Sequence, residues 1–147
     1  MPLFPSVEWF DAVRREFNSD ESVRGGGGGT CDARVGIRVG ESLFLLVFEG
    51  FECESASMIE ESDLESADFY LDMSPEDWED MLTNIQENGE ATFDYTLNTI
   101  DLDSENGLAL SVTGDQYRQD LFFRYNQTFQ YFFDLSSRVQ TEFSDGV

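Results

Sequence analysis

The fold of this chain depends on Tyr117-Arg-Gln-Asp-Leu-Phe-Phe-Arg-Tyr-Asn-Gln-Thr-Phe-Gln-Tyr-Phe-Phe133, which holds eight aromatic residues in seventeen positions. On a helix with 100° per residue, one apolar face spans an arc of about 160°. It comprises Tyr117, Leu121, Phe122, Tyr125, Phe129, Phe132 and Phe133, and Asp120, Arg124 and Gln127 lie opposite. At roughly 150 to 250 Å² per ring, this face carries on the order of 1,000 Å² of apolar surface. The stretch therefore predicts an amphipathic helix that covers a sheet, a partner or a hydrophobic ligand.

The sheet that this helix could cover is predicted from four segments, residues 31–40, 42–54, 67–73 and 108–113. Residues 31–40 alternate strictly, which indicates a strand with one apolar face and one solvated face. Residues 43–48 are apolar on both faces, so the second segment should be the central strand. The acidic residues 55–66 predict a solvated loop or short helix. We expect the first three strands to form an antiparallel meander.

Two further helices have clear boundaries. Ser6 is a suitable N-cap for the first, whose apolar positions are Trp9, Phe10, Val13 and Phe17. The second begins with Ser74 as N-cap and Pro75 at the first helical position, and it ends at Gly89. Its apolar positions are Trp78, Met81, Leu82 and Ile85, spaced to pack on a sheet. Asp115 is placed to cap the aromatic helix.

The remaining segments predict connections within one domain of residues 1–147. Residues 19–30 include a run of five glycines, which favours a flexible loop over a phosphate-binding loop because no Lys follows. Residues 91–106 fit neither a helical nor a strand period and predict a connector with a short helix. Residues 135–147 lose the pattern and predict a frayed tail.

Charge excludes several classes of partner. Thirty-one Asp and Glu residues face eight Arg residues, without Lys or His, for a formal net charge of -23. Without a basic stripe, nucleic acid and anionic membranes are poor partners. We interpret this composition as adaptation to a salty (halophilic) cytoplasm, where salt confines charge repulsion to about 3 Å at 1 M. The alternative is an acidic protein from a low-salt host that has a basic partner.

The chain offers few groups for catalysis or metal binding. Without His, imidazole ligands and Ser-His or Cys-His nucleophiles are excluded. Cys31 and Cys53 predict free, partly buried thiols rather than a zinc site or a disulfide framework. Residues 101–107 resemble a calcium loop, but the required Gly and Glu are missing at positions 6 and 12. We therefore expect no metal, no cofactor and no enzymatic activity.

The location of the protein is predicted from its apolar runs. The N-terminal residues have neither a basic nor an apolar signal region, and no apolar run approaches 18 residues. We expect a soluble cytoplasmic protein without stable membrane insertion.

Two short motifs suggest a family. Ala67-Asp-Phe-Tyr-Leu-Asp-Met-Ser-Pro-Glu-Asp-Trp78 is a strand-to-helix passage, and Gly107-Leu-Ala-Leu-Ser-Val-Thr-Gly-Asp115 is a strand with a closing turn. In these motifs and in the order of its elements, the chain resembles the sterol carrier protein 2 (SCP2-like) family of lipid-binding domains. The resemblance implies an α+β fold with a five-stranded, largely antiparallel sheet and helices packed on one face. It also implies a hydrophobic tunnel that takes sterols, fatty acyl chains or similar lipids without chemistry.

The favoured function is thus the binding or transfer of a hydrophobic ligand, such as a sterol, fatty acyl or isoprenoid lipid, between sheet and helices. The predicted wall residues are Phe44, Leu46, Phe48, Phe69, Leu71, Trp78, Leu82, Phe122, Tyr125 and Phe129. The alternative is a solid-cored interaction module, which could form a homodimer through the aromatic helix. An enzyme that uses Asp and Tyr as acid and base ranks third. Whether the rings line a cavity or fill one is a question for the tertiary structure.

Overall fold

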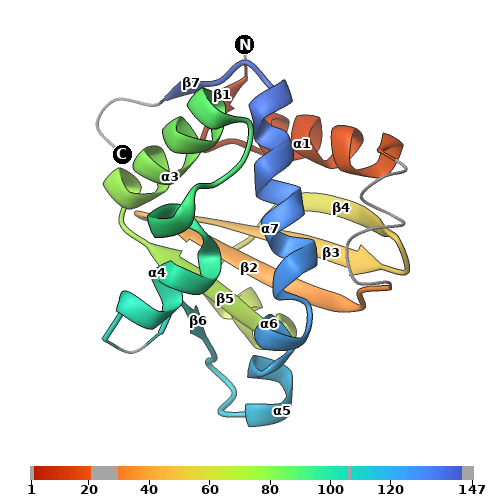
Figure 1. Cartoon of the computed structure of the whole chain (residues 1–147). Coiled ribbons are helices and arrows are strands. Elements are labelled where there is room, and N and C mark those ends of the chain that lie inside the picture. The colour runs from red at the N-terminus through yellow and green to blue at the C-terminus, as the bar shows by residue number, and fades with distance from the viewer. Residues whose placement is uncertain (1, 21–29, 106, 144–147) are drawn as a thin grey trace.

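The computed structural model describes residues 2–20, 30–105 and 107–143, and its largest element is a five-stranded sheet. The strands are β2 (Ala33–Val39), β3 (Ser42–Glu49), β4 (Glu52–Met58), β5 (Phe69–Met73) and β6 (Ala109–Leu110). Their order across the sheet is β4-β3-β2-β5-β6 (Figure 1). The α+β class and the five strands agree with the prediction. Strand β3 is internal, but the central strand of the sheet is β2, not β3 as predicted.

The sheet is mixed, which corrects the prediction of a largely antiparallel sheet. The antiparallel meander consists of β2, β3 and β4, because the segment predicted as one strand over residues 42–54 turns back at Gly50. The predicted third strand is β5, and it pairs with β2 in parallel, with Val35 opposite Phe69 and Val39 opposite Met73. Strand β4 is thus the fifth strand, which the sequence pattern did not reveal.

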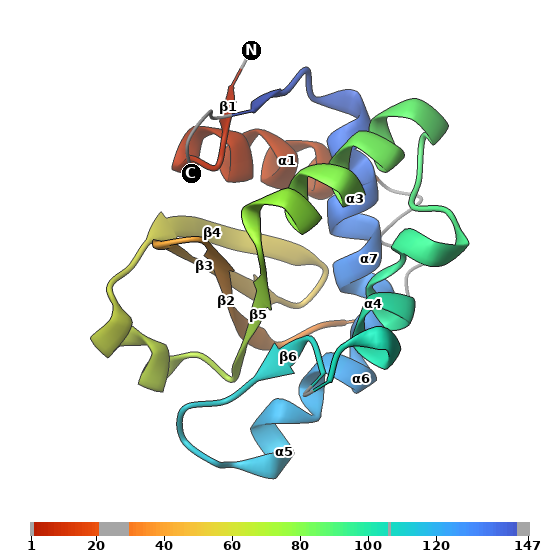
Figure 2. The same ribbon diagram turned by 90° about the vertical axis from the view of Figure 1, so that its left-hand side faces the viewer.

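Helices gather on one side of this sheet (Figures 1 and 2). They are α1 (Val7–Ser19), α3 (Pro75–Asn88), α4 (Leu97–Asp103), α5 (Gln116–Gln119), α6 (Leu121–Arg124) and α7 (Asn126–Asp134). Short 3₁₀ helices are η1 (Glu61–Ser66), η2 (Phe93–Tyr95) and η3 (Leu135–Arg138). Helix α4 and η2 form the connector that was predicted over residues 91–106.

The predicted helix starts are confirmed by hydrogen bonds. Ser6 accepts from the backbone N–H of Trp9, and Ser74 accepts from that of Asp77, both at 3.1 Å. Gly89 ends α3 in the left-handed region with φ 82°, a conformation that glycine adopts without a Cβ penalty. Asp115 caps α5. Each of these caps depends only on residues within one helical turn.

The aromatic stretch differs from the single helix that was predicted. Backbone breaks at Asp120 and Tyr125 divide it into α5, α6 and α7. Tyr117 of the predicted apolar face lies outward, with 70% of its surface exposed, whereas Phe123, which is exposed, was not part of that face. Phe122, Phe129, Phe132 and Phe133 remain fully buried. The helical arc therefore predicts the burial correctly within α7 and fails for α5, where the helical phase is lost.

The core lies between the inner face of the sheet and the helices. Phe44, Leu46 and Phe48 of β3 point into it, next to Phe10 and Phe17 of α1, with ring centroids 4.8 Å apart for Phe10 and Phe44. The apolar positions predicted for α1 and α3 are all buried. The predicted wall residues of β3, Phe44, Leu46 and Phe48, therefore lie on the face of the sheet that the helices cover.

The outer face is less solvated than predicted. A Cβ at Gly36 would lie 2.8 Å from Tyr70 Cβ and 3.1 Å from Leu64 Cδ2, so β2 needs glycine where η1 and β5 approach it. Leu64 is buried at this contact. The side of residues 31–40 that alternation predicts to be wet is therefore partly covered by η1.

The segment after α7, for which the sequence predicts a frayed tail, packs against the core over residues 135–143. Leu135 and Val139 are buried, and β7 (Glu142–Phe143) pairs in parallel with β1 (Leu3–Phe4). Trp9 Nε1 donates to Thr141 Oγ1 at 2.9 Å. Residues 144–147 and most of the predicted glycine loop, residues 21–29, lie outside the described residues.

Candidate functional site

The ten predicted wall residues come together in one place. Nine are buried, and Tyr125 is partly buried against the same apolar cluster. Phe129 of α7 has its ring centroid 5.3 Å from Phe48 of β3 and 5.5 Å from Phe69 of β5. Phe122 of α6 lies 5.8 Å from Phe69. The sheet and helices thus meet through contacting rings, mainly in edge-to-face arrangements, which aromatic pairs favour.

The buried indole of Trp78 shows how this layer satisfies its polar groups. Trp78 Nε1 donates to the carbonyl oxygen of Arg38 at 2.8 Å, which links α3 to β2. The two cysteines also belong to the core: both are free, as predicted, and they are fully buried where partial burial was predicted. Burial raises the pKa of each thiol to about 12, so neither is a nucleophile near neutral pH.

A cavity of about 270 Å³, here called the α3–α4 pocket, opens at one end of this core. It is lined by Met73, Asp77, Asp80, Asp94, Tyr95, Ile100, Asp103 and Ser104. Met73, at the end of β5, belongs to the apolar core cluster, and Ile100 of α4 packs against it. The pocket therefore has an apolar floor that is continuous with the wall residues.

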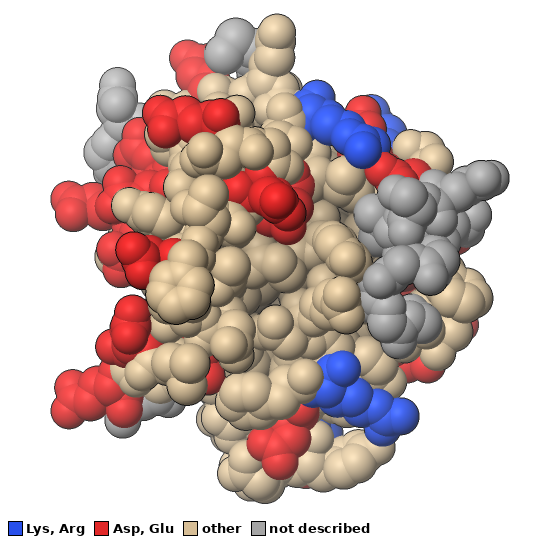
Figure 3. All heavy atoms as spheres, in the orientation of Figure 1, with Lys and Arg blue, Asp and Glu red and all other residues tan. Residues whose placement is uncertain are grey.

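Four aspartates surround this floor. Asp77 and Asp80 come from α3, Asp94 from η2 and Asp103 from α4, and all four are exposed. Acidic side chains gather along the side of the molecule where α3 and α4 lie (Figure 3). Among the described residues, none of the four forms an ion pair with an arginine. The rim is thus a concentration of uncompensated negative charge.

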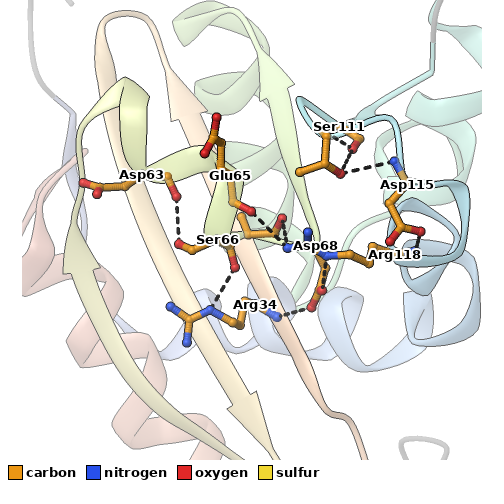
Figure 4. Close-up of polar contacts among 10 residues, drawn as sticks. Arg34, Asp63, Glu65, Ser66, Asp68, Ser111, Asp115 and Arg118 are labelled. Atoms are coloured by element: carbon orange, nitrogen blue, oxygen red, sulfur yellow. Dashed lines mark hydrogen bonds and ion pairs between the residues drawn. The ribbon is translucent and has the colours of Figure 1, made fainter.

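A second hollow, of about 340 Å³, has polar groups that are already engaged. It lies at the start of β2 and the end of β3, and its lining includes Arg34 and Asp68. Arg118 of α5 donates from Nε to Asp68 Oδ1 at 3.0 Å, and the backbone N–H of Arg34 donates to Asp68 Oδ2 at 2.8 Å (Figure 4). Arg118 Nη2 also donates to the carbonyl of Ala67 at 2.8 Å. These bonds fasten α5 to β5 and β2, so we assign them a structural role.

None of the pocket residues was among the predicted wall residues. The segment over residues 91–106 carries Tyr95 and Ile100 but fits no period, so the sequence pattern did not show that both line the same pocket. Asp77 and Asp80 are three residues apart on the polar side of α3, and this spacing could have predicted that the two carboxylates are neighbours. Their approach to Asp94 and Asp103 depends on how η2 and α4 fold back, and only the tertiary structure shows it.

Other classes of site find no support in the part of the chain that is described. Within it, no group of three or more His, Cys, Asp or Glu residues is arranged to hold a metal ion. No helix in the same residues is long and apolar enough to cross a membrane.

Comparisons with known proteins give no further guide. No family model matches the chain. No curated protein and no solved structure is significantly similar to it. The function has to be argued from the core and the pocket.

Proposed function

We propose that the protein binds a hydrophobic small molecule or lipid without chemical conversion, and that the ligand enters at the α3–α4 pocket. The observation that carries this proposal is the apolar floor of the pocket, where Met73 and Ile100 continue the core between sheet and helices. Sites for small molecules are typically concave and apolar, with a few polar groups at the rim. The α3–α4 pocket likewise combines apolar side chains, Met73 and Ile100, with polar groups at its rim.

The layers of the fold give independent support. A five-stranded sheet with helices on one side is the coarse arrangement that the sterol carrier protein 2 resemblance implies, although the sheet here is mixed and not largely antiparallel. In such an arrangement, the space between the layers is where a hydrophobic ligand would lie. Here that space is closed by rings such as Phe129 and Phe69. We infer that the head of the ligand occupies the pocket and that its apolar part displaces side chains at the floor.

The size of the cavity limits the ligand. About 270 Å³ is just below the roughly 300 to 1,000 Å³ of typical small-molecule sites. A short alkyl or isoprenoid chain fits with small shifts of Met73 and Ile100. A molecule as large as a sterol needs the α4 segment to move away from α3.

Ligand binding is tested with Nile red, an uncharged hydrophobic probe, and with native mass spectrometry of protein purified from its own source. We expect saturable probe binding and a co-purified small molecule. Ile100→Trp fills the pocket and should weaken binding by about tenfold or more, which corresponds to about 1.4 kcal/mol. Leu102→Trp is the control, because Leu102 lies on the same helix with 74% of its surface exposed. Unsaturable binding, or an equal response of the two variants, would refute the proposal.

The homodimer alternative has to use other residues than predicted. Phe129, Phe132 and Phe133 of α7 are at most 1% exposed within a single chain, so they are already occupied by its own core. The exposed aromatic side chains of this stretch are Tyr117 and Phe123, at 70% and 56% exposure. A dimer revealed by light scattering that is lost in Tyr117→Ser or Phe123→Ser would support this second function.

A further inference from the structure

The α3–α4 pocket combines an apolar floor with a rim that carries one sign of charge. A ligand seated on Met73 and Ile100 has its polar end among Asp77, Asp80, Asp94 and Asp103. The carboxylates come from three separate elements and converge on one cavity. The pocket therefore has a definite electrostatic preference in addition to its shape.

An anionic head group would be repelled in this position. A carboxylate or phosphate would meet four like charges at the rim, and solvent only partly screens repulsion between charges within a Debye length of each other. Among the residues that the structure describes, no arginine lines the pocket, and the chain contains no lysine to compensate the added charge. Hydroxyl groups would avoid the repulsion but gain only hydrogen bonds, for example with Ser104.

A cationic head group would be attracted by the same rim. An ammonium group donates hydrogen bonds to carboxylates, and such charge-assisted bonds are roughly twice as strong as neutral ones. Tyr95 lines the pocket beside the carboxylates, and an aromatic ring adds cation–π attraction for a cation over its face. The pocket thus favours a ligand with a cationic head group, because its carboxylates on α3, η2 and α4 and the ring of Tyr95 all attract positive charge.

We propose that the α3–α4 pocket selects hydrophobic organic cations, such as alkyl or isoprenoid amines, over carboxylates with the same apolar chain. This inference rests on the proposed function, and it specifies the chemical class of ligand. It differs from a general effect of the net charge of -23, because it depends on the four aspartates that line the pocket. The two effects respond differently to salt and to local substitutions.

The experiment compares octylammonium, octanol and octanoate as competitors of Nile red in about 1 M KCl, where the Debye length is about 3 Å and distant charges are screened. We expect octylammonium to bind at least about tenfold more tightly than octanoate, with octanol between them. The double variant Asp80→Asn/Asp103→Asn should reduce the ammonium-to-carboxylate ratio by about tenfold. Neither side chain makes a hydrogen bond within the described residues, so the variant should fold normally.

The control variant Glu79→Gln/Glu87→Gln changes the net charge equally on exposed positions of α3 outside the pocket. It should leave the ratio unchanged. Equal affinities for the three competitors, or equal ratios in the rim and control variants, would overturn this inference and leave the proposed function standing. If none of the competitors displaces the probe and Ile100→Trp has no effect, the proposed function fails and this inference with it.

Discussion

Phe129 is the residue on which both layers of the core converge. Its ring contacts Phe48, Phe69 and Phe122, and it is 1% exposed. Phe129→Ala removes these contacts and leaves a cavity, so we expect the free energy of unfolding to fall by about 3 to 5 kcal/mol in urea denaturation. Phe123→Ala, at a position 56% exposed, should cost less than about 1 kcal/mol. Similar losses for the two variants would mean that Phe129 is not packed as described.

Asp134 is a residue whose ionisation opposes stability. Its Oδ1 accepts from the backbone N–H of Ala91 at 3.0 Å and from Gln130 Nε2 at 2.9 Å. Burial raises the pKa of this carboxyl above its ordinary 3.8, despite these bonds. As pH rises, the unfolded chain therefore loses this proton before the folded protein does. The contribution of Asp134 is fully favourable below pH 3.8 and is lost as pH rises through the folded-state pKa.

Asp134→Asn should remove this dependence, because an amide oxygen can still accept both hydrogen bonds without carrying charge. Relative to the variant, the natural protein should lose stability as pH rises from about 3.5 toward neutral, in urea denaturation at several pH values. Asp134→Ala separates the charge from the hydrogen bonds and should be less stable than Asp134→Asn throughout. A constant difference between the natural protein and Asp134→Asn across this range would contradict the assignment.

At the scale of elements, the edge strand β4 depends on α1. The Asn18 side chain imitates a neighbouring strand: its Oδ1 accepts from the backbone N–H of Cys53 at 2.8 Å, and its Nδ2 donates to the Cys53 carbonyl at 2.9 Å. Asn18→Ala leaves the backbone N–H of Cys53 without this partner and leaves its carbonyl only a long bond of 3.5 Å from Arg14 Nη1. We therefore expect the free energy of unfolding to fall by about 1 to 3 kcal/mol and hydrogen exchange in β4 to become faster. Asn88→Ala is the control, because the side chain of Asn88 bonds only within its own helix, to Asn84.

The same strand shows why elements were predicted unequally. The helix over residues 75–88 was predicted to the residue, because Ser74, Pro75 and Gly89 act within one turn of its ends. Strand β4 has the sequence Glu-Cys-Glu-Ser-Ala-Ser-Met, whose polar composition is that of a loop. It is a strand because β3 supplies backbone partners on one side and Asn18 does so on the other. The side chains of β4 alone therefore do not predict a strand.

At the scale of the whole molecule, the net charge of -23 should make stability depend on salt. Local ion pairs, such as those of Asp11 with Arg14 and Arg15, offset only part of this repulsion. If the composition reflects adaptation to a salty cytoplasm, the melting temperature should rise markedly between roughly 0.1 and 3 M KCl as the charges are screened. A melting temperature that does not change with KCl concentration would reject the hypothesis.

The amino-acid sequence by itself determined the features that depend on neighbouring residues. These are the caps at Ser6, Ser74 and Asp115, the inward faces of α1, α3 and α7, and the apolar character of β3. Caps and periodic faces follow from contacts within one turn or along one strand, so a local pattern is sufficient. For the same reason, the ten residues predicted to line a cavity could be recognised as inward-facing, and nine of them are buried, with Tyr125 partly buried.

Only the tertiary structure decided how distant segments meet. It sets the parallel pairing of β2 with β5, the breaks at Asp120 and Tyr125, and the pairing of β1 with β7. It also brings four aspartates from α3, η2 and α4 around the floor of one pocket. These arrangements depend on which apolar faces of distant helices and strands pack against one another. A short window of sequence does not include both partners, so it cannot predict them.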